Sequence, residues 1–271
     1  MSKFPILRKI RTFVKREGRL TPGQEKALSE LWPQWGLNFD GANPVLPEDD
    51  FFRQNSQRYL DIGFGNGETI EEMALLNPDK QFIGIEVHRP GVGSLLHRMQ
   101  QNHLSNIRLL NYDAVQIIES ELFDFQFDGI YLLFADPWPK RKHIKRRMVQ
   151  AEFVQKVTRL IKPGGYFYIA TDWNDYAKHI RHVMQGQTQF NFESNITSAA
   201  ETIIKEGPHI IKSSAAVAET NIKTDNSQVK PHDKVSSLMA EDVIIRPNSK
   251  YERRGQKLGH KIHDMLYRLK T

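Results

Sequence analysis

RYLDIGFGNGET, residues 58–69, contains the clearest structural signal in the chain. A short apolar run over residues 58–62 leads into three glycines at alternating positions, and a helix-like pattern follows until the breaker pair Asn77-Pro78. Glycine lets the backbone turn sharply and approach a ligand closely, and a helix that begins after such a turn directs its N-terminus at that ligand. The segment therefore predicts a strand, a tight turn and a helix, in that order.

The same alternation continues along the chain. Further apolar runs predict strands, and segments with helical spacing lie between them. The predicted strands are 58–62, 81–87, 106–110, 128–134 and 166–171. The predicted helices are the segment that follows the glycines and stops after residue 76, and then 92–99, 114–119, 148–161 and 176–183. We expect the helix at 148–161 to stop at Lys162-Pro163-Gly164-Gly165. Strands that alternate with helices predict a doubly wound, mostly parallel α/β sheet, with residues 262–269 as an antiparallel closing strand.

Length and composition exclude several classes of protein. The chain has 271 residues, 39% of them hydrophobic and 26% charged, which is typical of a globular protein. It has no apolar stretch near the roughly 20 residues that a membrane span needs, and residues 1–20 lack a secretory signal. The chain has no cysteine, which excludes disulfides, thiolate nucleophiles and sulfur-ligated zinc. We expect a cytoplasmic protein that binds no membrane and no metal.

Basic residues gather in three clusters although the formal net charge is only +6. Residues 1–19 hold seven bases and one acid, residues 140–147 hold six bases, and residues 246–261 hold six bases and one acid. Clusters of this kind favour a polyanionic partner, because phosphate contacts release counterions. Charge alone therefore favours nucleic acid, although each cluster by itself is compatible with a solvated surface.

The chain is expected to have two unequal parts. Residues 1–45 predict a basic N-terminal arm with a leading helix, and residues 46–271 predict the main domain. Residues 193–250 contain no aromatic residue, so they can bury little surface. We expect a flexible insertion at about residues 193–245.

The glycine turn resembles motif one of the S-adenosylmethionine-dependent methyltransferases, which have a Rossmann-like sheet. A dinucleotide fingerprint would need glycine or alanine where Glu68 stands, so a dehydrogenase does not fit. Asp61 places an acid at this turn, which suits a ligand with a cationic sulfonium and ammonium better than one with a pyrophosphate. On the resemblance, Asp61, Gly63, Gly65 and Gly67 bind the cofactor, although the glycine turn alone is equally compatible with any strand-to-helix connection.

Two more acids follow the next two predicted strands. Glu86 lies 19 residues after Gly67, where a carboxylate can accept hydrogen bonds from both ribose hydroxyls. Asp113 follows the third strand, at the place expected for a contact to adenine. Each acid alone is compatible with a helix cap or a solvated loop, but the carboxyl ends of neighbouring parallel strands meet at one crevice.

FADPWPKRKHIKRR, residues 134–147, follows the fourth strand and combines an acid, an aromatic ring and a basic run. Two prolines stiffen the loop and would hold Asp136 and Trp138 in place. Trp138 offers a flat face for an unstacked base, and the bases beyond it can bind phosphates. The loop predicts a catalytic edge that faces a nucleic acid.

These segments together resemble the bacterial single-chain tRNA (guanine-N7-)-methyltransferases. The resemblance rests on DIGFGNGET (61–69), GIEVHRPGV (84–92), NYDAV (111–115), FADPWPKRKHIKRR (134–147), ATDWNDYA (170–177) and SKYERRGQKLGH (249–260), and FVKREGRLT (13–21) and LWP (31–33) also fit. It spans the chain except for about residues 193–245. It implies methyl transfer from S-adenosylmethionine to N7 of a guanine in the variable loop of tRNA.

The resemblance also implies roles for individual residues. Asp136 would be the active-site acid and, with Asp61, Glu86 and Asp113, would lie at the cofactor. The residues implied for tRNA binding are Lys140, Lys142, His143, Lys145, Arg146, Arg147, Asp172, Ser249, Lys250, Tyr251 and Glu252. Residues 249–252 read SKYE where the family usually has TKFE, and Ala135 stands where the family often has proline. The expected partner is tRNA, with a monomer or homodimer and no obligatory protein partner.

Two other functions stay open from the residues alone. Asp136-Pro137-Trp138-Pro139 loosely resembles the loop of methyltransferases that act on an exocyclic amine of DNA or RNA. An RNA-binding module that keeps the fold without activity is the other alternative. Guanine N7 has a lone pair and no proton, so we expect Asp136 to act through position and charge rather than as a base.

Overall fold

The computed structural model describes residues 12–13, 18–39, 50–53, 56–120, 123, 125–193, 243, 246–247 and 249–271, without the side chains of Arg53, Lys250 and Tyr251. The predicted insertion at about 193–245 and most of the predicted basic arm lie outside these residues. Among the described residues, no helix has the length and hydropathy that crossing a membrane requires.

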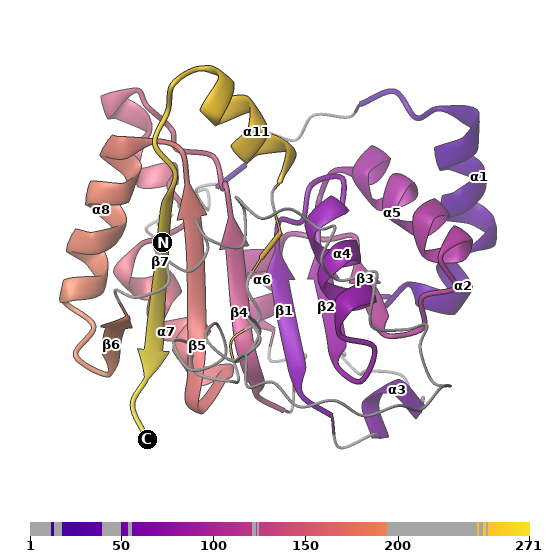
Figure 1. Ribbon diagram of the computed structural model, residues 1–271, viewed down its shortest axis with the longest axis horizontal. Helices are drawn as coiled ribbons and strands as arrows, with labels where there is room; N and C mark the ends of the chain where they lie inside the picture. The colour runs from indigo at the N-terminus through magenta and orange to yellow at the C-terminus, as the bar shows by residue number, and fades with distance from the viewer. Residues whose placement is uncertain are drawn as a thin grey trace, which may run out of the picture.

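A seven-stranded sheet forms the centre of the molecule (Figure 1), in the order β3-β2-β1-β4-β5-β7-β6. β1, β2, β3, β4 and β5 pair in parallel, whereas β7 is antiparallel to both β5 and β6. The strands are β1 Arg58–Ile62, β2 Gln81–Ile85, β3 Ile107–Leu110, β4 Phe127–Leu133, β5 Ile161–Thr171, β6 Phe190–Glu193 and β7 His263–Leu269. The predicted doubly wound, mostly parallel sheet with an antiparallel closing strand is confirmed.

Helices cover both faces of the sheet because the strands are apolar on both sides. Leu60 and Ile62 point into one core, beneath α6, α7 and α8, while Tyr59 points into the other, beneath α1, α2, α4 and α5. The helices are α1 Pro22–Glu30, α2 Trp32–Trp35, α3 Asp50–Arg53, α4 Glu68–Leu76, α5 Arg89–Gln101, α6 Ala114–Glu119, the 3₁₀ helix η1 Arg141–Arg146, α7 Ala151–Arg159, α8 Asn174–Gln185 and α11 Lys250–Lys257.

The helices near the N-terminus pack on the main sheet. The indole of Trp35 donates to the carbonyl of Leu104 at 2.9 Å, and the Leu37 amide donates to the Leu109 carbonyl of β3 at 2.8 Å. The Gln24 side chain of α1 donates to Ser94 of α5 at 3.0 Å. These contacts join α1 and α2 to α5 and β3, and the division of the chain near residue 45 stays a prediction.

The connection from α7 to β5 differs from the prediction. The helix ends at Arg159, and β5 already begins at Ile161, so Lys162-Pro163-Gly164-Gly165 lies inside the strand rather than in a helix stop. Ile161 pairs with Phe127, and the pairing resumes at Tyr166 opposite Gly129 after a register shift. Gly164, at φ +81°, takes the left-handed conformation within the shift.

Candidate active site at the carboxyl edge of the sheet

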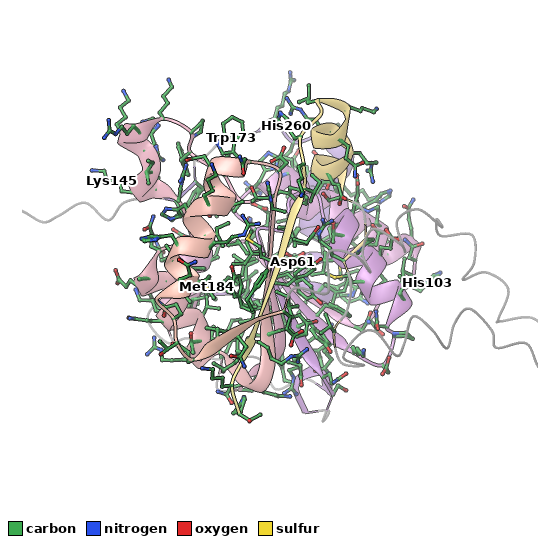
Figure 2. The ribbon with its side chains drawn as sticks, turned by 60° about the vertical axis from the view of Figure 1, so that its left-hand side comes forward. Asp61, His103, Lys145, Trp173, Met184 and His260 are labelled. Carbon is green, nitrogen blue, oxygen red and sulfur yellow. The ribbon has the colours of Figure 1, made fainter. Side chains whose placement is uncertain are left out.

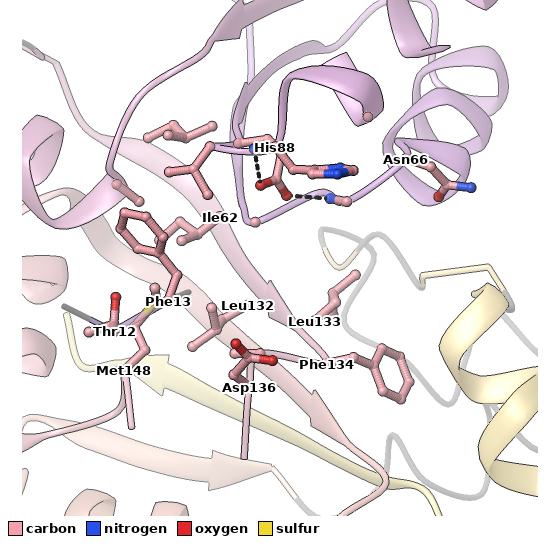
Figure 3. Close-up of a pocket in the computed structure, with 18 of the residues that line it drawn as sticks. Thr12, Phe13, Ile62, Asn66, His88, Leu132, Leu133, Phe134, Asp136 and Met148 are labelled. Carbon is pink, nitrogen blue, oxygen red and sulfur yellow. Dashed lines mark hydrogen bonds between the residues drawn. The ribbon is translucent and has the colours of Figure 1, made fainter. Parts of the chain in front are cut away.

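A cavity of about 750 Å³ opens at the carboxyl ends of β1, β2, β3 and β4. In an open α/β sheet, ligands bind at this edge, beside the strand where the order of connections reverses. One wall comes from the glycine loop and the start of α5, and the other from the end of β4 (Figure 3). The volume is in the range of small-molecule sites.

The three glycines of the loop have left-handed backbones, with φ of +77° at Gly63, +63° at Gly65 and +80° at Gly67. Gly63 and Gly65 border the cavity, and a Cβ at Gly63 would meet no atom within 4 Å. Gly67 is buried, and its Cβ would lie 2.7 Å from Leu95. The first two glycines therefore give the ligand access to the backbone, and the third sets the start of α4.

Glu86 lies directly after β2 and joins the glycine loop to the start of α5. One of its carboxylate oxygens accepts from the Gly65 amide at 2.7 Å and the other accepts from the His88 amide at 2.8 Å (Figure 3). Burial raises the pKa of Glu86, and these amides partly offset that effect. Glu86 thus lines the cavity and also holds the glycine loop against the start of α5.

Asp113 is a helix cap at the wall of the cavity, and its contact with adenine stays a prediction. Its Oδ1 accepts from the Val115 amide at 3.0 Å, which makes it the N-cap of α6. The same residue lines the cavity beside Tyr112, at the end of β3. The cap fixes the orientation of the carboxylate at this end of the cavity.

Asp61 is a buried acid whose carboxylate accepts no hydrogen bond from the described part of the chain. Its side chain is on β1, only 2% of it is exposed, and neither carboxylate oxygen has a hydrogen-bond partner among the described residues. Burial first, and Glu86 second, raise its pKa to about 7. A small cavity of about 20 Å³ adjoins it and shares Gly63 and Phe134 with the large cavity. A cationic group bound here would satisfy the carboxylate, so the site suits a ligand that carries an ammonium.

The chain after β4 turns sharply to present Asp136. Phe134 has a φ of +55°, an unfavourable backbone for a side chain of this size. Its amide donates to the Ala170 carbonyl at 2.8 Å, and the Arg246 guanidinium covers its ring at 5.2 Å. Figure 3 shows the Phe134 ring directed away from Asp136, which is exposed and lines the cavity.

The basic loop divides into exposed cations and structural ones. Lys140, Lys142 and Lys145 are exposed, and Figure 2 shows Lys145 at the outer tip of the molecule, far from Asp61. Desolvation first, and then the neighbouring cations, lower the pKa of His143. The lysines therefore remain available to a polyanion.

Trp138 differs from the expected open stacking platform. The Arg146 guanidinium lies 3.7 Å from the centre of its ring, and its indole donates to the Thr12 carbonyl at 2.9 Å. Arg146 also donates to the Phe13 carbonyl at 3.1 Å. One face of Trp138 is therefore covered, and the pair holds residues 12–13 at the cavity wall.

Arg147 does not have the position expected of a phosphate-binding residue. Its side chain is 2% exposed and donates to the Pro137 carbonyl at 2.9 Å and to Asp175. It also lies over the Tyr176 ring at 5.3 Å. The buried guanidinium thus ties the loop to α8, and a contact of Arg147 with tRNA stays a prediction.

Ser249 and Glu252 have structural roles at the start of α11, and their expected contact with tRNA stays a prediction. Ser249 caps the helix by accepting from the Glu252 amide at 3.1 Å, and the Glu252 side chain is 2% exposed. Glu252 pairs with Arg246, which also donates to Asp264 at 2.8 and 3.0 Å. The side chains of Lys250 and Tyr251 lie outside the described residues.

Asp172 lies at the end of β5, against α11. Its carboxylate is 3.3 Å from the His260 ring nitrogen, and a Cβ at Gly255 would lie 3.1 Å from it. Figure 2 shows Trp173 and His260 at the same end of the molecule, and their rings are 6.3 Å apart. Asp172 is therefore half-buried in a helix contact rather than part of the large cavity.

Sequence reasoning missed two parts of the wall. Arg254 of α11 lines the large cavity although the ERRG segment was linked to the family only as a pattern, and Thr12 and Phe13 line it as well. Their positions depend on long-range packing, which no local spacing reports. The described residues contain no group of three or more His, Asp or Glu that could hold a metal ion.

A glycine loop after β1, an acid at the carboxyl end of each of β1 to β4 and a cavity at the switch point of a doubly wound sheet define an S-adenosylmethionine-dependent methyltransferase of Rossmann-like fold. A family model described as "Putative methyltransferase" matches residues 55–226. Named relatives extend the match to almost the whole chain. The tRNA (guanine-N(7)-)-methyltransferase of Alcanivorax borkumensis is 41% identical over 97% of this chain and 92% of that protein. The tRNA (guanine-N(7)-)-methyltransferase of Alkalilimnicola ehrlichii is 38% identical over 96% of this chain and 93% of that protein.

The chain belongs to the tRNA (guanine-N(7)-)-methyltransferase family. Among solved structures, the 16S rRNA methyltransferase KamB aligns with a TM-score of 0.45 and 15% identity, over 85% of this chain and 98% of that chain. A likeness at that level adds nothing to the assignment.

Proposed function

We propose that this chain transfers a methyl group from S-adenosylmethionine to N7 of a guanine in the variable loop of tRNA. The observation that carries the proposal is the acid-lined cavity bordered by Asp136, with the exposed Lys140, Lys142 and Lys145 on the same loop. A cationic cofactor suits the cavity, and an RNA backbone suits the lysines. The names of the full-length relatives supply the target atom.

S-adenosylmethionine supplies a methyl group carried on a positively charged sulfur. Asp61 would hold the ammonium of its methionine part, Glu86 would accept from the ribose hydroxyls, and Asp113 would contact the adenine. Each of these acids lies at the carboxyl end of a strand in the β1–β3 half of the sheet. Their spacing along that edge would align the ligand with its reactive end toward β4.

Asp136 would act on the guanine rather than on a proton. Because N7 has a lone pair and no hydrogen, no side chain has to remove a proton there. The purine becomes positively charged as the methyl group arrives, and a fixed carboxylate stabilises that charge. The positive φ at Phe134 and the Ala170 hydrogen bond would keep Asp136 at the cavity.

We also propose where the tRNA would lie and where the protein works. Lys140, Lys142 and Lys145 would bind phosphates, with Asp172 and α11 near the same edge. A tRNA substrate implies work in the cytoplasm. A monomer or homodimer without an obligatory protein partner stays a prediction.

Labelled S-adenosylmethionine and an unmodified tRNA transcript test the proposal. After the reaction, reduction and aniline cleavage should cut the product at one variable-loop guanine, and Asp136→Ala should abolish the cut. Label without cleavage would instead indicate an exocyclic amine as the acceptor. Binding of tRNA without any label would indicate an RNA-binding module that has no activity.

A further inference from the structure

The large cavity has an uneven distribution of charge. Glu86, Asp113 and Asp136 line it, and Arg254 is the one lysine or arginine among the described lining residues. S-adenosylmethionine carries one anionic group, the carboxylate of its methionine part. A carboxylate in a cavity lined by acids needs a cation or several amide donors to offset the repulsion.

Arg254 lies at the end of the site that suits the methionine part. Ser249, which begins the same helix, lines the small cavity beside Asp61. The neighbouring Arg253 pairs with Glu68, in the first turn of α4, at 2.8 Å. Figure 1 shows α11 above the carboxyl ends of β1 and β4, whereas Asp113 follows β3, two strands away from β1. The helix therefore lies over the glycine loop and away from the adenine end.

The helix that carries Arg254 is fixed in place. The buried Arg246, just before the helix, joins Glu252 of α11 to Asp264 of β7. One turn further along the same buried face, Gly255 packs closely against Asp172 at the end of β5. The backbone of Arg254 is therefore already placed, and binding a ligand has to order only its exposed side chain.

We propose that Arg254 binds the carboxylate of the methionine part of S-adenosylmethionine, while Asp61 holds the ammonium of the same group. The inference rests on the proposed function and deepens it by assigning an anion-binding residue to the cofactor site. The two side chains together form a pair of opposite charges that matches the two charges of the amino acid. A guanidinium recognises a carboxylate through two parallel hydrogen bonds.

Binding measurements with two ligands test this assignment without any turnover. S-adenosylhomocysteine contains the amino-acid group, whereas 5′-methylthioadenosine lacks it but keeps the adenosine and the sulfur. Calorimetry on the full chain should show that Arg254→Met lowers the affinity for S-adenosylhomocysteine by about tenfold or more. The affinity for 5′-methylthioadenosine should not change, and Arg254→Lys should recover part of the loss.

Arg253→Met is the matched control, because its side chain is on the same helix but pairs with Glu68 and is exposed. We expect less than a threefold effect on either ligand. Equal losses for both ligands in Arg254→Met would overturn the inference, since they would indicate a disturbed cavity. Unchanged binding of both ligands with a raised KM for tRNA would overturn it too, and would assign Arg254 to the RNA. If the wild-type chain binds neither ligand, the proposed function itself fails.

Discussion

At the scale of single residues, Asp61 shows how the site exchanges stability for binding. A carboxylate that is 2% exposed and has no hydrogen-bond partner among the described residues destabilises the folded chain when it is ionised. Its pKa of about 7 means that the folded state keeps a proton that the unfolded state releases near pH 4. Stability without ligand therefore falls as pH rises from about 4 to 7 and is then constant.

Asp61→Asn should stabilise the ligand-free protein at pH 8 and weaken the binding of the cofactor. The raised pKa means that the ionised carboxylate destabilises the folded protein by about 4 kcal/mol. A buried asparagine amide without partners would still cost roughly half of that free energy. Thermal melts should show a Tm raised by roughly 5 °C at pH 8 and little change at pH 4.5. Calorimetry should show at least a tenfold loss for S-adenosylhomocysteine. A lower Tm at pH 8 would contradict the assignment.

The same pKa predicts a pH dependence for cofactor binding in the wild type. An ionised Asp61 attracts the ammonium, so affinity for S-adenosylhomocysteine should rise by up to about tenfold per unit between pH 5.5 and 7. The rise should disappear in Asp61→Asn, which is the internal control. An equally steep rise in the variant would assign the titration to another group, such as Glu86, whose pKa is also raised.

Close packing of the glycine loop gives a second test at this scale. A Cβ at Gly91 of α5 would lie 2.0 Å from the Gly65 carbonyl oxygen, so Gly91→Ala must displace the loop or the helix. We expect a loss of about 3 kcal/mol in the free energy of unfolding, measured in urea, and weaker cofactor binding. Gly23→Ala is the control, since no atom lies within 4 Å of a Cβ there. It should be neutral or stabilising by up to about 1 kcal/mol.

The positions of some residues at the cavity could be predicted from the sequence, and the reason is local. Glu86 and Asp113 follow strands that are recognisable by their apolar runs, and both line the cavity. Arg147 and Glu252 could not be assigned, because nothing local distinguishes a buried arginine or glutamate from an exposed one. The ion-pair partner of Arg147 is Asp175, 28 residues away in sequence, and that of Glu252 is Arg246, 6 residues away.

At the scale of elements, α11 and the loop after β4 depend on one another through Arg246. Its side chain is 2% exposed, pairs with Glu252 and Asp264, and covers the ring of Phe134. The carboxylates of Glu252 and Asp264 would be left without their cation if Arg246 were removed. The network thus joins the helix over the cofactor site to the turn that presents Asp136.

Arg246→Met should destabilise the protein by about 3–5 kcal/mol, because it leaves buried carboxylates unpaired. Urea unfolding measures the change. The matched control is Lys26→Met, which removes a cation from the exposed pair with Glu30 at 3.8 Å and should change stability by less than about 0.5 kcal/mol. A loss for Arg246→Met as small as that of the control would mean that α11 is held by other contacts.

The alternation of strands and helices could be predicted because the buried strands are short apolar runs. The exceptions have physical causes. β5 extends back to Ile161 because Phe127 of β4 pairs with this residue. β6 is a strand of only four residues at the edge of the sheet. α11 has a polar, strongly charged sequence, and its position is set by Arg246 and Gly255 rather than by an apolar face.

At the scale of the whole molecule, the proposed RNA-binding surface lies at the carboxyl edge of the sheet. Figure 1 shows the C-terminus at the other end, away from α11. Three basic clusters predicted a polyanion, but the sequence could not separate exposed cations from buried ones. The structure divides the loop cluster, with Lys142 and Lys145 exposed and Arg147 buried.

Charge reversal separates RNA binding from cofactor binding. Lys142→Glu with Lys145→Glu should raise the KM for tRNA by tenfold or more and reduce the salt slope of binding by about two. The affinity for S-adenosylhomocysteine should not change. Lys270→Glu, an exposed lysine at the opposite end, is the control and should leave the KM for tRNA within about twofold. Equal effects of the two variants would mean that charge acts over the whole surface.

The central claim is that N7 of a guanine accepts the methyl group. The most direct measurement compares two tRNAs that differ at one atom, with 7-deazaguanine in place of the variable-loop guanine in the second. Asp136 and the lysines still have the same RNA to bind, so the account predicts unchanged tRNA affinity and complete loss of methyl transfer to that tRNA. Methyl transfer to the 7-deazaguanine tRNA at the normal rate would contradict the claim.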